Sequence, residues 1–137
     1  MNTKAERFVL DSSAIIALME EEDGADRVAE VLSQRNSILP YMVLLKVYYI
    51  SLRERGQADA DRRYALMKQL PVKILWHTDE AVLMTAAHFK AFHRISLADA
   101  IIAAYAKLHN AILLHKDPEY ESLADKIKLE SLPFKNL

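Results

Sequence analysis

Short apolar runs alternate along this chain with longer segments in which apolar residues recur at helical spacing. Runs such as Phe-Val-Leu at 8–10 and Ile-Leu-Leu at 112–114 are typical of buried strands, while Val28, Val31 and Leu32 mark one face of an amphipathic helix. The expected strands cover 8–10, 37–39, 72–75, 112–114 and 127–129, and the expected helices cover 14–19, 25–35, 41–55, 58–70, 80–93 and 96–109, with another short helix from 117. Strands that alternate with helices predict an α/β fold, in which helices cover both faces of a parallel sheet and ligands bind at the carboxyl ends of the strands.

The size and charge of the chain narrow the function classes. Its 137 residues predict one domain spanning 1–137. A net charge of −1 argues against a nucleic-acid binder that relies on overall positive charge, so any such contact is local. The absence of cysteine excludes disulfides and thiolate metal sites. The amino terminus is too polar for a secretory signal, and no apolar stretch approaches the roughly 20 residues that cross a bilayer. We therefore expect a soluble, cytoplasmic protein.

Three aspartates are the strongest candidates for chemistry. Asp11 follows the first apolar run, Asp99 opens a very apolar helix, and Asp117 follows the strand expected at 112–114. Each has a purely structural explanation, because Asp11 and Asp117 could cap the next helix and Asp99 could complete a capping box with Ser96. In a parallel α/β fold, however, helix amino termini lie at the same edge as the carboxyl ends of the strands. We therefore expect all three carboxylates to gather there.

A shared location of three carboxylates predicts a metal site. Ionised carboxylates about 8 Å apart repel one another by roughly 2 kcal/mol per pair, for an effective dielectric constant of about 20. A hard divalent cation removes that cost, and oxygen ligands suit Mg²⁺ or Mn²⁺. Such an ion polarises a phosphoryl oxygen and lowers the pKa of a bound water. Capping explains each aspartate separately, whereas a metal explains their shared location.

Four segments, taken in order, carry a family resemblance that covers nearly the whole chain. They read FVLDSSAIIAL at 8–18, YMVLLKVYY at 41–49, ISLADAIIAAYA at 95–106 and ILLHKDPEY at 112–120. In this order and at this spacing they resemble the PIN-domain proteins, and in particular the VapC toxin ribonucleases of VapBC toxin–antitoxin systems. The resemblance implies a PIN-like three-layer α/β/α fold whose short parallel sheet has the order 3-2-1-4-5.

The same resemblance implies an activity and the residues that carry it. Asp11, Asp99 and Asp117 match the family's catalytic, metal-binding acids, and Ser13 matches a small polar residue beside the first of them. The family cleaves single-stranded RNA by phosphodiester hydrolysis that depends on a divalent metal, here expected to be Mg²⁺ or Mn²⁺. Members of the toxin branch usually form homodimers and are neutralised by a small VapB-like antitoxin whose tail covers the active site.

Lys46 departs from the family pattern, which has an acidic residue, typically glutamate, before Val-Tyr-Tyr. A charge inside so apolar a run needs a compensating partner, and the acidic cluster offers one. At about 4 Å and an effective dielectric constant of about 20, a lysine repels a divalent ion by up to roughly 8 kcal/mol. Three interpretations follow: Lys46 disables the nuclease, it replaces the metal as counter-charge and leaves a binding module, or it points outward to RNA phosphate. The first two are favoured.

Two main hypotheses for function remain. The first is a metal-dependent endoribonuclease impaired by Lys46. In that enzyme His115 either assists the site or simply fills space, because the family usually has a small hydroxyl residue at its position. The second is a non-catalytic PIN module that binds an antitoxin or RNA. A receiver-like signalling domain ranks low, because receivers carry two adjacent acids after their first strand and this chain has one, Asp11.

Overall fold

The first strand, β1 (Phe8–Leu10), forms the centre of a five-stranded sheet. The computed structural model describes residues 6–134, and in this part of the chain every neighbouring pair of strands is parallel. β1 lies between β2 (Ser37–Pro40) and β4 (Ile112–His115), while β3 (Val72–Leu75) and β5 (Lys128–Ser131) form the edges. The predicted α/β class and the order 3-2-1-4-5 are confirmed. The last strand begins one residue later than the sequence pattern indicated.

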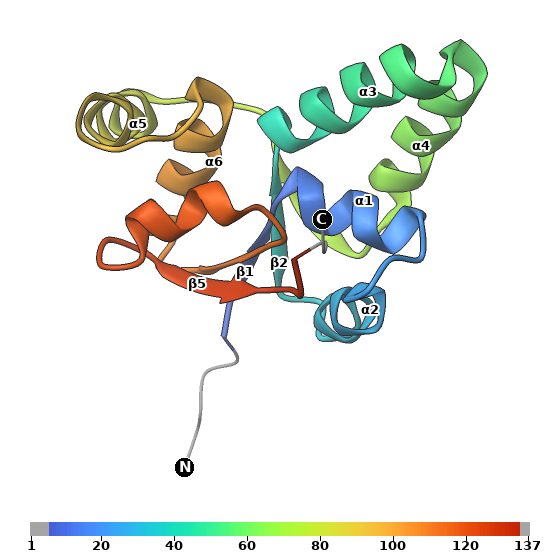
Figure 1. Ribbon diagram of the computed structural model, residues 1–137, viewed down its shortest axis with the longest axis horizontal. Helices are drawn as coiled ribbons and strands as arrows, with labels where there is room; N and C mark the ends of the chain where they lie inside the picture. Colours follow the sequence, from blue (N-terminus) through green and yellow to red (C-terminus); the bar gives the residue numbers. More distant parts are fainter. Residues whose placement is uncertain (1–5, 135–137) are drawn as a thin grey trace.

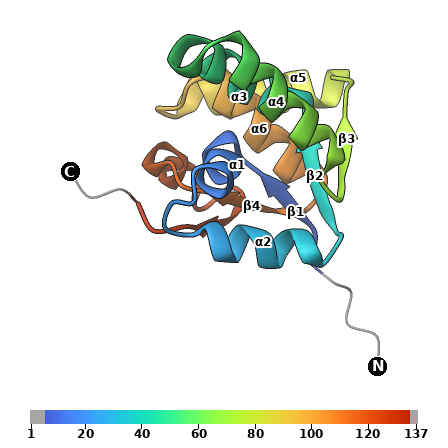
Figure 2. The same ribbon diagram turned by 90° about the vertical axis from the view of Figure 1, so that its right-hand side faces the viewer.

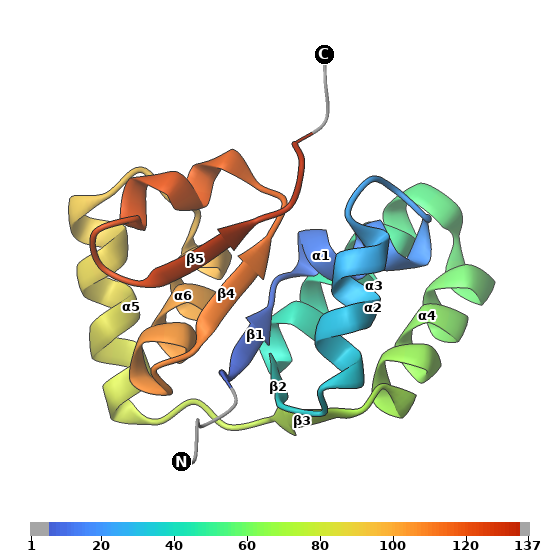
Figure 3. The ribbon, with the colours of Figure 1, turned by 90° about the horizontal axis from the view of Figure 1, so that it is seen from below.

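Helices lie on both sides of this sheet. Within the described residues they are α1 (Ser12–Met19), α2 (Ala25–Ser33), α3 (Tyr41–Arg55), α4 (Gln57–Gln69), α5 (Glu80–Phe92), α6 (Leu97–Leu108) and the short 3-10 helix η1 (Pro118–Leu123). The α5–α6 pair lies on one side of the molecule and the α3–α4 pair on the other (Figures 1 and 3). Figure 2 shows α2 below the sheet and α3 to α6 above it. This is the three-layer arrangement that the resemblance implied.

The central strands are buried because helices cover both of their faces. Leu10, Leu113 and Leu114 are fully buried, and the buried face of α6, which includes Ile102, packs on β1 and β4. Continuous apolar runs are what such doubly covered parallel strands require. The reversal from α3 to α4 takes place at Gly56, whose φ of +95° lies in the left-handed region that favours glycine.

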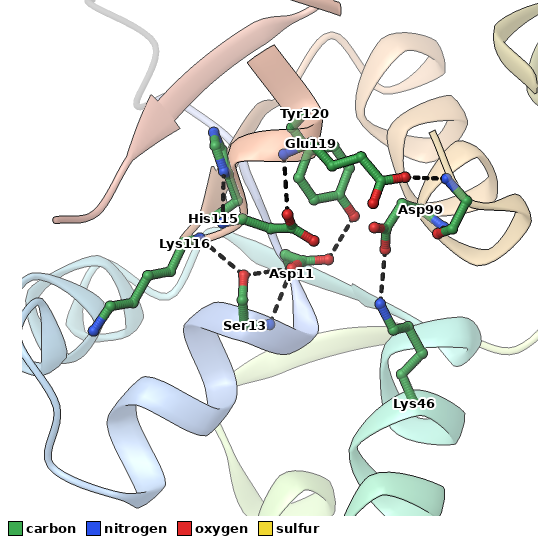
Figure 4. Close-up of polar contacts among 10 residues, drawn as sticks. Asp11, Ser13, Lys46, Asp99, His115, Lys116, Glu119 and Tyr120 are labelled. Carbon is green, nitrogen blue, oxygen red and sulfur yellow. Dashed lines mark hydrogen bonds and ion pairs between the residues drawn. The ribbon is translucent and has the colours of Figure 1, made fainter. Parts of the chain in front are cut away.

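The connections after the central strands position the candidate site. α1 follows β1 after one residue, and η1 follows β4 after two residues, so both helices start at the carboxyl edge of the sheet. The amino terminus of α6 joins them there, where Figure 4 shows Asp99 beside the residues that follow β1 and β4. None of the helices within 6–134 combines the length and the hydropathy of a membrane-spanning segment.

Candidate metal centre

Asp11 joins the end of β1 to α1 and caps that helix. Its backbone amide donates to the carbonyl of Leu114 in β4 at 3.0 Å. Its Oδ2 accepts from the backbone amide of Ser13 at 3.0 Å and from the Ser13 hydroxyl at 2.5 Å. Its Oδ1 accepts from the hydroxyl of Tyr120 at 2.6 Å. These bonds occupy both oxygens and hold a carboxylate that is almost completely buried (Figure 4).

Asp99 lies in the first turn of α6, which Ser96 caps by accepting from the Asp99 amide at 3.2 Å. The second half of the predicted capping box is wrong. The backbone amide of Ser96 donates to Glu119, and Asp99 Oδ1 accepts from Lys46 Nζ at 2.8 Å instead. Glu119 therefore caps α6 from a distant segment, and the Asp99 carboxylate points into the site (Figure 4).

Asp117 caps η1 by accepting from the backbone amide of Glu119 at 3.0 Å. Asp99, Asp117 and Glu119 each offer a carboxylate oxygen, and these three atoms lie within 4.8 Å of one another. Among the described residues this is the acidic cluster that could hold a metal ion. Asp11 adjoins it closely enough that the charge of Asp99 raises the pKa of Asp11. The three aspartates singled out in the sequence therefore lie together.

Burial governs the protonation of the groups around Asp11. Burial first, and then the charge of Asp99, raise the pKa of Asp11, although hydrogen bonds from Ser13 and Tyr120 and the charge of Lys46 oppose that shift. Burial and the neighbouring carboxylates of Asp11 and Asp99 raise the pKa of Tyr120 well above its ordinary value. The phenol therefore stays protonated and remains a hydrogen-bond donor to Asp11.

Lys46 projects from α3 into the cluster. Its side chain is 14% exposed and that of Asp99 2%, so their ion pair is largely shielded from water. Burial alone would lower the pKa of Lys46, but the hydrogen bond to Asp99 and the charges of Asp11 and Asp99 outweigh it, and the net shift is upward. The expected compensating partner of Lys46 is thus Asp99. The outward orientation considered for Lys46 is wrong.

Two further predicted site residues hold the acids in place. The Ser13 hydroxyl, besides donating to Asp11, accepts from the backbone amide of Lys116 at 2.8 Å and so ties α1 to the end of β4. His115 is fully buried against the ring of Tyr120, and its Nδ1 accepts from the Asp117 amide at 3.2 Å. Its Nε2 makes no hydrogen bond within the described residues, but it lies 3.4 Å from Glu121 Oε2. His115 is therefore in a position to orient the backbone at Asp117.

The donor atoms of the cluster fit a divalent cation. Oxygen ligands about 2.1 Å from an octahedral Mg²⁺ ion lie roughly 3.0 to 4.2 Å from one another. Oxygens of Asp99, Asp117 and Glu119 that already lie within 4.8 Å of one another reach that spacing through small side-chain shifts. The one conflict is the Lys46 ammonium, which occupies one oxygen of Asp99. The site thus offers suitable ligands together with a competing positive charge.

The comparison with protein families shows to which family this chain belongs. The family model described as the PIN domain matches residues 8–126, which include all the acids described above. The chain belongs to the PIN-domain family. Among curated proteins, no sequence matches it significantly.

Solved structures of VapBC toxin–antitoxin proteins share this PIN fold. VapBC2 from Rickettsia felis, bound to a promoter DNA fragment, is 15% identical with a TM-score of 0.74 and covers 92% of this chain and 98% of its own. Mycobacterium tuberculosis VapC20, a toxin that cleaves the sarcin–ricin loop, is 16% identical with a TM-score of 0.72 and covers 92% and 99%. VapBC-1 from nontypeable Haemophilus influenzae is 20% identical with a TM-score of 0.68 and covers 90% and 96%. At these identities the likeness is one of fold.

Glu119 and Tyr120 are the site residues that the sequence argument missed. They lie in η1, directly after the Asp117-Pro118 pair that was interpreted as a helix start. An acid in the first turn of a helix has an ordinary role beside the helix dipole, and a tyrosine is an ordinary core residue. The only available signal was their position two and three residues after a candidate ligand at the ligand-binding edge of the sheet.

Proposed function

We propose that this protein is an endoribonuclease of the PIN toxin type that depends on Mg²⁺ or Mn²⁺, and that Lys46 reduces its activity. The observation that carries the proposal is the gathering of Asp99 and Asp117, with Asp11 beside them, at the carboxyl edge of a PIN-domain sheet. A group of buried and half-buried acids needs a counter-charge, and oxygen donors favour a hard divalent ion. The whole of 1–137 is proposed to act as one domain.

The chemistry follows from what each part would do. A divalent ion bound by these aspartates would polarise a phosphoryl oxygen and lower the pKa of a water molecule. The chain's own residues would position the acids: Ser13 and Tyr120 fix Asp11, and His115 fixes the backbone at Asp117. Ligands held this firmly lose little freedom when an ion binds.

Impairment by Lys46 follows from its position and charge. An ion bound by Asp99 must either displace the ammonium from Oδ1 or share that carboxylate with it. The repulsion between a divalent ion and an ammonium about 4 Å away has an upper value of roughly 8 kcal/mol at an effective dielectric constant of about 20. Because the long side chain can swing away, the expected result is weak metal binding and slow cleavage.

The proposed substrate and partners follow the same family. We propose single-stranded RNA as substrate, a VapB-like antitoxin as partner, and a cytoplasmic location without membrane attachment. The antitoxin is supported by the fold shared with VapBC complexes from Rickettsia felis and Salmonella typhimurium, each solved with DNA. The net charge of −1 means that the RNA contact would be confined to a local surface.

A homodimer is proposed from the apolar surface of α3. Leu45 is 50% exposed and Tyr49 is 42% exposed, one turn apart on this helix. An apolar groove of about 700 Å³ lies beside Leu45 and is lined by Tyr41, Leu44, Leu45, Tyr48, Asp61, Tyr64 and Trp76. Analytical ultracentrifugation should give a dimer for the native chain and for Leu108→Glu, and a monomer for Leu45→Glu. A monomeric native chain at micromolar concentration would contradict the proposed dimer.

A comparison of RNA cleavage between variants tests the enzymatic proposal. Lys46→Glu restores the acid typical of the family, and we expect at least about a tenfold gain in Mn²⁺-dependent cleavage of single-stranded RNA, equivalent to about 1.4 kcal/mol. Lys126→Glu makes the same charge change at a half-exposed position outside the cluster and should have no such effect. Adding Asp99→Asn to Lys46→Glu should abolish the gain. If Lys46→Glu stays inactive while its fold is intact, this chain is not a latent nuclease.

The second candidate is a non-catalytic PIN module that binds an antitoxin or RNA. It is favoured by the Lys46–Asp99 ion pair, which supplies a counter-charge without any metal. The two candidates differ in the response of Lys46→Glu: a binding module gains no cleavage but still binds an antitoxin or RNA.

A further inference from the structure

Glu119 lies in the acidic cluster although it is not one of the three acids that the family resemblance marks as metal-binding. It is the second residue of η1, and its backbone amide donates to Asp117 Oδ1. Its side chain extends towards α6, where Oε1 accepts from the backbone amide of Ser96 (Figure 4). One carboxylate oxygen is therefore held by the amino terminus of α6, and the side chain of Glu119 connects the segment that carries Asp117 to the helix that carries Asp99.

On α3 this chain lacks the acidic residue that the family pattern has at the position of Lys46. There Lys46 contributes an ammonium, which binds Asp99 Oδ1. Asp11 does not replace the lost acid, because it is already one of the three aspartates proposed for the site, and its two oxygens also accept three hydrogen bonds from Ser13 and Tyr120. Glu119, by contrast, places an oxygen within 4.8 Å of oxygens from both Asp99 and Asp117.

We propose that Glu119 is a direct ligand of the divalent ion in this chain and supplies the carboxylate that α3 lacks. The ion would lie among Asp99, Asp117 and Glu119. Three carboxylates this close together carry more negative charge than the single ammonium of Lys46 neutralises, which favours an added divalent ion. This inference rests on the proposed function, because it concerns the metal of the same site.

A purely structural role is the competing explanation for Glu119. Its bond to the Ser96 amide caps α6, and that role alone could account for its position. Glu119→Gln separates the two roles, because the amide oxygen of glutamine can still accept from Ser96 while the negative charge is lost. Asp125→Asn is the matched control, because it removes one acidic charge from a side chain that is 76% exposed and lies outside the cluster.

Binding of Mn²⁺, followed by electron paramagnetic resonance of the free ion, gives the required measurement without an activity assay. We expect Glu119→Gln to weaken Mn²⁺ binding at least about tenfold, because the number of charged ligands sets the affinity of an oxygen site. Asp125→Asn should stay within about twofold of the native chain, since an exposed distant charge is screened. Urea denaturation in EDTA should show that Glu119→Gln remains folded.

A second background distinguishes this inference from the proposed function. In Lys46→Glu the acid on α3 is restored, so Glu119→Gln should there cost less than about threefold in Mn²⁺ affinity, because other carboxylates supply the charge. Equal affinity of the native chain and Glu119→Gln would overturn the role of Glu119. The role of Glu119 would also be overturned if the native chain bound no Mn²⁺ up to about 1 mM while Lys46→Glu bound the ion. In that case the proposed function would still stand. Failure of Lys46→Glu itself to bind Mn²⁺ would reject both.

Discussion

Replacing Lys46 by methionine should remove the ammonium that neutralises the acidic cluster, so that a divalent ion becomes its only strong counter-charge. Methionine has nearly the length and volume of lysine and keeps the packing of the side chain on α3, but it removes the ammonium. Asp99 then remains buried beside Asp11 with no positive partner. We expect the variant to be destabilised in metal-free buffer and to regain stability when a divalent ion is added.

The geometry of the ion pair sets the size of this effect. Lys46 Nζ lies 2.8 Å from Asp99 Oδ1, and the two side chains are 14% and 2% exposed. At that distance the attraction is about 6 kcal/mol for an effective dielectric constant of about 20. Desolvation cancels part of it, and removing one partner of a buried pair costs about 3–5 kcal/mol in measured cases. We therefore expect the free energy of unfolding of Lys46→Met to fall by about 3 kcal/mol at pH 7.

Urea denaturation in EDTA measures the loss of stability without metal, and urea denaturation in Mn²⁺ measures its recovery when the ion binds. An ion present at about 100 times its dissociation constant stabilises the folded state by about 2.7 kcal/mol, so Mn²⁺ should recover most of the loss in Lys46→Met and change the native chain much less. Lys126→Met, at a half-exposed position, should shift stability by less than about 0.5 kcal/mol in either buffer. If Mn²⁺ stabilises the native chain as strongly as Lys46→Met, then lysine and metal do not compete and the reasoning fails.

Three further predictions test individual contacts by urea denaturation. Tyr120→Phe removes the 2.6 Å bond to buried Asp11 and should cost about 1–3 kcal/mol, with no loss if that bond is unimportant. Ser96→Ala removes the side-chain cap of α6 and should cost about 1 kcal/mol, whereas Ser96→Gly should cost only a few tenths. The bidentate hydrogen bond from Arg27 lowers the pKa of Glu130 below its unfolded value of 4.5. Its stabilisation is therefore present above that pH and is lost as the pH falls through the folded-state pKa, so Glu130→Gln should cost about 0.5–1 kcal/mol at pH 7 and nothing once the carboxyl is protonated. A penalty that does not change with pH would contradict this assignment.

The elements of the fold could be read from local patterns. The run at 8–10 became β1, and the cap residues Asp11, Ser96 and Asp117 each start a helix as their neighbours indicated. Apolar periodicity and caps act over one or two turns, so they depend on residues close together in the chain. The boundaries shifted by a residue or so, as at β5, because the register with β4 determines where a strand ends.

The edge at which the three aspartates gather could also be anticipated. In a parallel sheet the carboxyl ends of the strands and the amino termini of the following helices lie together, whatever the details of packing. The order of the strands, by contrast, could not be derived from the apolar periodicity of the chain. It was expected from the family resemblance alone, and the pairing of β1 with both β2 and β4 confirmed it.

The contacts within the site depend on long-range packing. Lys46 meets Asp99 across 53 positions, and Tyr120 meets Asp11 across 109. The sequence indicated that Lys46 needs a partner, because an unpaired buried charge is costly. Only the placement of α3 beside α6 selects Asp99 for that role, and only the path of η1 brings Glu119 to the same carboxylates. Side chains this far apart in the chain are brought together by the packing of the whole core. The residues flanking each side chain therefore do not determine which partner it contacts.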